Sequence, residues 1–80
     1  MTIDYQDLIL INAVLQEKGL RYRVSYKNNS VACINPPGEC CQTPEQSQLT
    51  LQVIEGYYQK KNIHVVFSED SLFFSLQAMS

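Results

Sequence analysis

The sequence contains no tryptophan, a single histidine, and only three residues each of glycine, proline and cysteine. With one histidine and no cysteine pair in CxxC spacing, a structural zinc site of the usual kind is not indicated. No apolar run approaches the roughly 18 residues that a membrane-spanning helix needs. The N-terminus has no basic segment followed by an apolar one, as a secretion signal would. We therefore expect no membrane insertion and no secretion, and a cytoplasmic location by default.

Charge is also sparse and shows no clustering. Six basic and eight acidic residues give a net charge of −2, and neither set forms a run. Nucleic-acid binding usually needs a basic patch, so nucleic acid is an unfavoured partner. Eighty residues fit one domain, which buries only about 60% of its unfolded surface. An oligomer interface would therefore add useful stability, and a homodimer is expected.

The stretch from Glu45 to Ser68 is predicted to be an amphipathic helix that leads directly into a strand. Thr43 suits the N-cap, and Pro44 suits the first helical position. At roughly 100° per residue, one narrow stripe is polar and the rest of the surface is apolar. The polar stripe contains Gln48, Gln52, Glu55 and Gln59, and the apolar residues are Leu49, Leu51, Val53, Ile54, Tyr57 and Tyr58. We expect the small size of Gly56 to serve close packing, and both tyrosine hydroxyls to reach water.

A second helix is predicted from Thr2 to Lys18, ended by Gly19. Its inner side is expected to contain Ile3, Leu8, Leu10, Ile11, Val14 and Leu15. Tyr5, Ile9 and Ala13 lie on the opposite side, beside Asn12 and Gln16. An aromatic and a branched aliphatic residue on the outer side of a helix suggest a contact surface.

Four segments alternate polar and apolar residues, as half-buried strands do. They span residues 20–26, 31–35, 63–68 and 72–78, and form two hairpins. Pro36-Pro37-Gly38 ends the second segment, because proline cannot donate a hydrogen bond to a neighbouring strand.

The two halves of the chain align as repeats of helix, strand and strand, with residues 16–25 matching residues 59–68. In this alignment, Asn12 and Tyr5 on the outer side of the first helix correspond to Glu55 and Gln48 of the second helix. We therefore predict a single α+β domain over residues 1–80, built as a two-layer αββαββ sandwich. Its units, 1–35 and 43–80, are joined by residues 36–42, and its four-stranded, mostly antiparallel sheet carries both helices on one face.

The three cysteines allow several interpretations. Cys33 is expected to be a small core residue, with Cys40 and Cys41 as reduced loop thiols. A disulfide from Cys33 to either of the others, or a zinc site with His64, is a less favoured alternative. A nucleophile–base pair between His64 and a loop thiol is conceivable, but nothing in the sequence brings the two together.

No acid pair, phosphate-binding loop or metal cluster is visible, so we expect a non-enzymatic protein without a cofactor or a metal. The favoured hypothesis is a small protein that acts by binding another protein or itself, as an inhibitor, adaptor or subunit. The candidate partner-binding residues are Tyr5, Ile9, Ala13, Arg21, Arg23, His64 and Phe73. One alternative is a single-stranded RNA-binding module, because arginines beside an aromatic on an open sheet resemble a stacking platform. A further alternative is a thiol redox or zinc role of the loop that contains Cys40 and Cys41.

Overall fold

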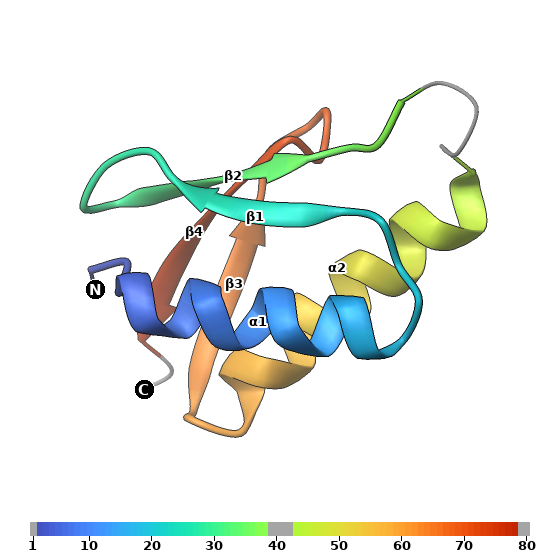
Figure 1. The fold of residues 1–80 in the computed structure, drawn as a ribbon. Helices are drawn as coiled ribbons and strands as arrows, with labels where there is room; N and C mark the ends of the chain where they lie inside the picture. Colours follow the sequence, from blue (N-terminus) through green and yellow to red (C-terminus); the bar gives the residue numbers. More distant parts are fainter. Residues whose placement is uncertain (1, 39–42, 79–80) are drawn as a thin grey trace.

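The computed structural model describes residues 2–38 and 43–78 and shows two helices packed on a four-stranded antiparallel sheet (Figure 1). The elements follow the order α1 (Tyr5–Glu17), β1 (Arg23–Tyr26), β2 (Val31–Asn35), α2 (Pro44–Gln59), β3 (Ile63–Phe67) and β4 (Phe73–Ala78). The strand order across the sheet is β1-β2-β4-β3. The predicted α+β class and the αββαββ order are confirmed.

Both helices begin at capping residues that the sequence supplies. The Asp4 carboxylate accepts a hydrogen bond from the backbone N–H of Gln6, and the Thr43 hydroxyl accepts one from the N–H of Gln46. Each bond pairs an amide that the first helical turn leaves without a partner. Gly19 follows α1 with φ of 75°, and Asn62 follows α2 with φ of 60°, so both helices end at residues that tolerate the left-handed conformation.

The core lies between the helix layer and one face of the sheet. Register places the inner residues of all four strands on this face, since Val24 pairs with Ile34, Ala32 with Phe74, and Val65 with Leu76. The core residues are Ile3, Leu8, Ile11, Leu15, Leu20, Tyr22, Val24, Ala32, Ile34, Ile54, Tyr58, Ile63, Val65, Phe74 and Leu76. The opposite face of the sheet is not covered by either helix.

The strand order makes the two halves equivalent in position. β1 and β3 are both edge strands, and β2 and β4 pair with each other at the centre. α1 contacts β1, while α2 contacts β3, so each helix packs on the edge strand of its own half. This arrangement agrees with the predicted repeat of helix, strand and strand.

Several expectations for single residues are wrong. Leu10 was expected to face the core but is 48% exposed, because it lies on the outer side of α1. Cys33 is not a core residue: its neighbours Ala32 and Ile34 are buried, and Cys33 lies half-buried on the open face of the sheet. The first strand begins at Arg23, three residues later than expected.

The hydroxyls of two adjacent tyrosines also differ from expectation. Tyr58 is fully buried, so its hydroxyl does not reach water, and it makes no hydrogen bond within the described residues. Burial, followed by nearby negative charge, raises the pKa of Tyr58. The Tyr57 hydroxyl donates to Asp7 of α1.

Candidate binding groove and neighbouring surfaces

An open groove of about 540 Å³ runs between α1 and α2. Its α1 wall contains Ile11 and Val14, with Lys18 and Leu20 after the end of the helix. Its α2 wall contains Leu49, Gln52, Val53, Gly56, Tyr57 and Lys60. The α2 residues recur every three or four positions along about 16 Å of helix. The groove is therefore an elongated trough with apolar walls.

Gly56 does not pack closely, which corrects the expectation from sequence. A Cβ atom built at this position would meet no other atom within 4 Å, because it would point into the open groove. Glycine in a helix interior costs about 1 kcal/mol relative to alanine. No packing contact offsets that cost here, and the missing side chain widens the groove instead.

The charged groups that line the groove are both basic. Lys18 and Lys60 contribute to its walls, and no aspartate or glutamate does. Among the described residues, neither lysine forms an ion pair, since the ion pair found there joins Lys61 to Asp7. The chain is acidic overall, so this part of its surface has the opposite sign of charge.

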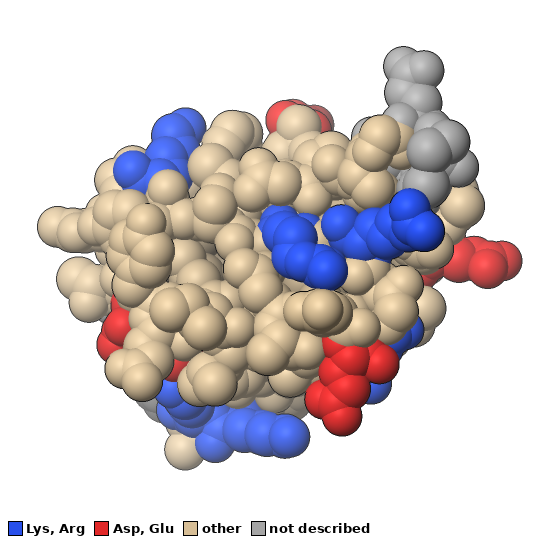
Figure 2. Space-filling model, in the orientation of Figure 1, with Lys and Arg blue, Asp and Glu red and all other residues tan. Residues whose placement is uncertain are grey.

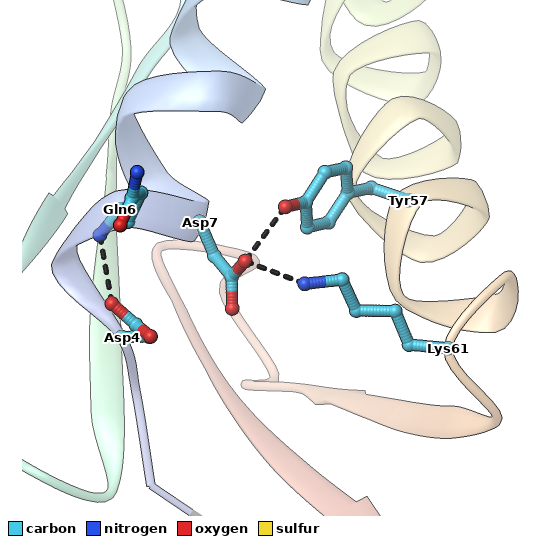
Figure 3. A network of polar contacts seen from close by, with 5 residues as sticks. All are labelled: Asp4, Gln6, Asp7, Tyr57 and Lys61. Carbon is cyan, nitrogen blue, oxygen red and sulfur yellow. Dashed lines mark hydrogen bonds and ion pairs between the residues drawn. The ribbon is translucent and has the colours of Figure 1, made fainter.

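A polar network fixes the spacing of the two helices near one end of the groove (Figure 3). The Tyr57 hydroxyl donates to Asp7 Oδ1 at 2.6 Å, and Lys61 Nζ donates to the same oxygen at 2.7 Å. Figure 3 shows the Asp7 carboxylate of α1 facing the ends of both side chains, Tyr57 from α2 and Lys61 from the turn that follows it. Lys61 Nζ also lies 5.0 Å from the centroid of the Tyr57 ring. We call Asp7, Tyr57 and Lys61 the interhelical clamp.

The clamp changes the acidity of its members. Burial alone would raise the pKa of Asp7, but the hydrogen bonds from Lys61 and Tyr57 and the charge of Lys61 outweigh it and lower that pKa. Burial and the bond to Asp7 raise the pKa of Tyr57. The bonds to Asp7 and Tyr57 raise the pKa of Lys61. Asp7 is therefore ionised and Lys61 is protonated at neutral pH.

The predicted contact surface on α1 is exposed as expected. Tyr5 and Ile9 are 65% and 62% exposed, and Ala13 is exposed beside them. The Tyr5 ring stacks on Tyr26 with a centroid distance of 5.2 Å. In the face shown in Figure 2, residues other than lysine, arginine, aspartate and glutamate cover most of the area over the N-terminal half of α1. A role for this surface in partner binding stays a prediction.

Of the other predicted residues, Arg23, His64 and Phe73 lie on the open sheet face, but not at one place on it. Phe73 pairs with Cys33 and His64 pairs with Gln77. Because Phe73 and Gln77 are four residues apart on β4, His64 lies about 13 Å from the Phe73 row. Arg21 is exposed just before β1.

Two side chains on this face make contacts within the protein that hinder base stacking. The Arg23 guanidinium donates to the carbonyl oxygens of Leu20 and Tyr22, both at 2.7 Å. Lys27 Nζ lies 4.2 Å from the centroid of the Phe73 ring and covers it. The RNA hypothesis uses the side chains of Arg23 and Phe73, and both are engaged within the protein.

The cysteine hypotheses depend on a loop outside the described residues. Cys40 and Cys41 lie there, so a disulfide or a zinc site with them stays a prediction. Cys33 and His64 are in different rows of the sheet, too far apart to bind one metal ion. Within residues 2–38 and 43–78, no group of three histidine, cysteine or acidic side chains is placed to bind a metal. In the same residues, neither helix has the length and hydropathy to cross a bilayer.

Sequence reasoning missed one interaction that shapes the helix layer. The side-chain amide of Asn12 donates to the backbone oxygen of Val24 at 3.0 Å and accepts from its N–H at 2.8 Å. Asn12 therefore satisfies the N–H and C=O groups of Val24, in the middle of edge strand β1, that do not bond to β2. The helical pattern placed Asn12 toward solvent, and only the position of α1 beside β1 reveals this role.

Comparisons of the chain with protein-family models, with curated proteins and with solved structures find no match.

Proposed function

We propose that this protein is a non-enzymatic binding module that receives an acidic amphipathic helix of another protein in the groove between α1 and α2. The observation that carries the proposal is the open apolar trough whose wall contains a glycine with no packing role. A helix that presents apolar residues at i, i+3 or i+4, and i+7 inserts them into grooves of this kind.

The shape of the trough favours a helix over a compact ligand. Its volume of about 540 Å³ falls within the usual range for small-molecule sites. However, its length follows three turns of α2 and two turns of α1, which matches the repeat of side chains along a third helix.

Charge selects the kind of helix. Lys18 and Lys60 would face the flanks of a bound segment, and no acid on the walls competes with them. Acidic residues beside the apolar stripe of the partner would pair with these lysines, which favours encounter and sets orientation. A basic helix would meet like charge on both sides.

A selection experiment tests the proposal. A phage-displayed library of helical peptides is selected on the wild-type protein, with counter-selection on Val53→Gln, which makes the groove wall polar. Acidic amphipathic sequences are expected to be enriched, and their binding is expected to weaken in Lys18→Glu. Gln77→Glu is the control, because it also introduces a glutamate but on the opposite side of the sheet.

The proposal fails if the enriched peptides bind Val53→Gln as well as wild type. It also fails if they bind without regard to charge at Lys18, or if no helical peptide is enriched. A circular dichroism spectrum of each variant shows that loss of binding is not loss of fold.

A further inference from the structure

We propose that the free edge of β3 pairs with β3 of a second copy of this chain, which joins the two sheets into one across a symmetric homodimer. This surface is separate from the groove, and the proposal does not depend on what the groove binds.

The edge at β1 is closed to a further strand. The N–H and C=O of Val24 that point away from β2 are both bonded to the Asn12 side chain. Tyr5 of α1 stacks on Tyr26 at the end of the same strand. An added strand would have to displace these contacts.

The edge at β3 has no such cover. The Ser68 N–H donates to Phe73 O at 2.9 Å. This bond determines which residues of β3 direct their backbone N–H and C=O groups toward β4 and which direct them away from it. Val66 and His64 therefore bond toward β4, and Ile63, Val65 and Phe67 direct their backbone groups away from it. Within the described part of the chain, these outward groups make no hydrogen bond.

The residue that matches Asn12 in the second half of the chain is Glu55. A carboxylate accepts hydrogen bonds but cannot donate to a backbone carbonyl, so it cannot bridge a peptide unit as Asn12 does. Glu55 is exposed. β3 also lacks the proline, lysine or bulge with which proteins commonly protect an edge strand.

The β3 segment is self-complementary about Val65. Antiparallel pairing of Val65 with its own copy places Ile63 opposite Phe67 of the second copy, so all three outward residues form backbone pairs. His64 then lies opposite Val66 on the open face. If the second copy of β3 is shifted by two residues in either direction along the first, one of these three backbone pairs is lost.

The antiparallel arrangement also brings opposite charges together at both ends of the paired strands. The turn before β3, which contains Lys60 and Lys61, lies beside the turn after β3 of the second copy, which contains Glu69 and Asp70. Of these four charged side chains, Lys61 donates to Asp7 of its own chain and Asp70 accepts from Ser68. The side chains of Lys60 and Glu69 make no hydrogen bond or ion pair within the described residues of their own chain. Because the interface is symmetric, each pairing occurs twice.

Charge reversal tests the antiparallel arrangement by sedimentation equilibrium. Wild type is expected to show a monomer–dimer equilibrium. Lys60→Glu and Glu69→Lys should each weaken it about tenfold, because two ion pairs are lost and like charges meet. Lys60 also lines the groove, but Glu69 does not, so the Glu69→Lys result is independent of groove binding.

Cysteine cross-linking tests the geometry. In the proposed register, positions 64 and 66 of opposite copies form a pair without backbone hydrogen bonds, where Cβ atoms approach closely enough for a disulfide. His64→Cys and Val66→Cys are prepared separately, mixed, and oxidised with oxidised glutathione. A disulfide joining position 64 to position 66, identified by mass spectrometry, is expected only in the mixture.

Three results would overturn the proposal. The first is a wild-type protein that stays monomeric at millimolar concentration. The second is a dimer whose constant is unchanged by Glu69→Lys. The third is a dimer in which the mixture of His64→Cys and Val66→Cys forms no disulfide between these positions, which would place the interface elsewhere.

Discussion

Replacing Gly56 by alanine is expected to make the protein more stable. Gly56 lies inside α2, where glycine costs about 0.8–1.0 kcal/mol relative to alanine, largely through the backbone entropy that folding removes. The new methyl group would meet no atom within 4 Å, so there is no steric penalty to subtract. The free energy of unfolding should therefore rise by about 1 kcal/mol.

Urea denaturation followed by circular dichroism measures this change. With a slope of about 1 kcal/mol per molar urea for a small domain, the midpoint should rise by about 1 M while the slope stays constant. The thermal midpoint should rise by about 4–8 °C. Helical peptides selected on the wild type should bind the variant more weakly, because the methyl group occupies part of the groove.

Ala13→Gly is the matched control in α1. Ala13 aligns with Gly56 in the internal repeat, and its side chain is exposed. The reverse substitution should lower the free energy of unfolding by a similar amount, about 1 kcal/mol. If Gly56→Ala is neutral or destabilising while Ala13→Gly behaves as expected, Gly56 is packed against other atoms and the groove is not open.

Four further predictions follow from single contacts. Asn12→Ala should lower the free energy of unfolding by about 1–3 kcal/mol in urea titration, because two hydrogen bonds to Val24 are lost. Tyr58→Phe should be neutral or stabilising by about 1 kcal/mol, because it removes a buried hydroxyl without a partner among the described residues; a loss of stability would contradict this. Asp7→Asn should destabilise the protein at pH 7 and converge with wild type in acid. The lowered pKa of Asp7 means that its contribution is present above the unfolded-state value and is lost as pH falls through the folded-state value. Ile9→Ser should change the free energy of unfolding by less than about 0.5 kcal/mol while reducing any association through the outer side of α1, which light scattering can measure.

The sequence was sufficient to predict the fold because its periodicities are strong and its turns are marked. The helical repeat around Ile54 and the alternation around Val65 each identify one element and its buried side. The caps at Asp4 and Thr43 use side chains that helix N-termini favour. Local patterns of this kind do not depend on which elements become neighbours.

The candidate sites were harder to predict because they depend on how the elements meet. The groove lies between α1 and α2, and Leu49, which lines it, stays 49% exposed on an otherwise apolar side of α2. The bond from Asn12 to Val24 requires α1 to lie beside β1. The open edge at β3 follows from the strand order, which sequence patterns did not supply.

The groove as a binding site is tested most directly by nuclear magnetic resonance chemical-shift mapping with an acidic amphipathic peptide from the selection. We expect the shifted amides to cluster along the groove, from Leu49 to Lys60 at α2 and from Ile11 to Leu20 beside it, with Gln77 and its neighbours unchanged. Shifts centred on the open sheet face, or on the outer side of α1 alone, would contradict the claim that the groove is the binding site.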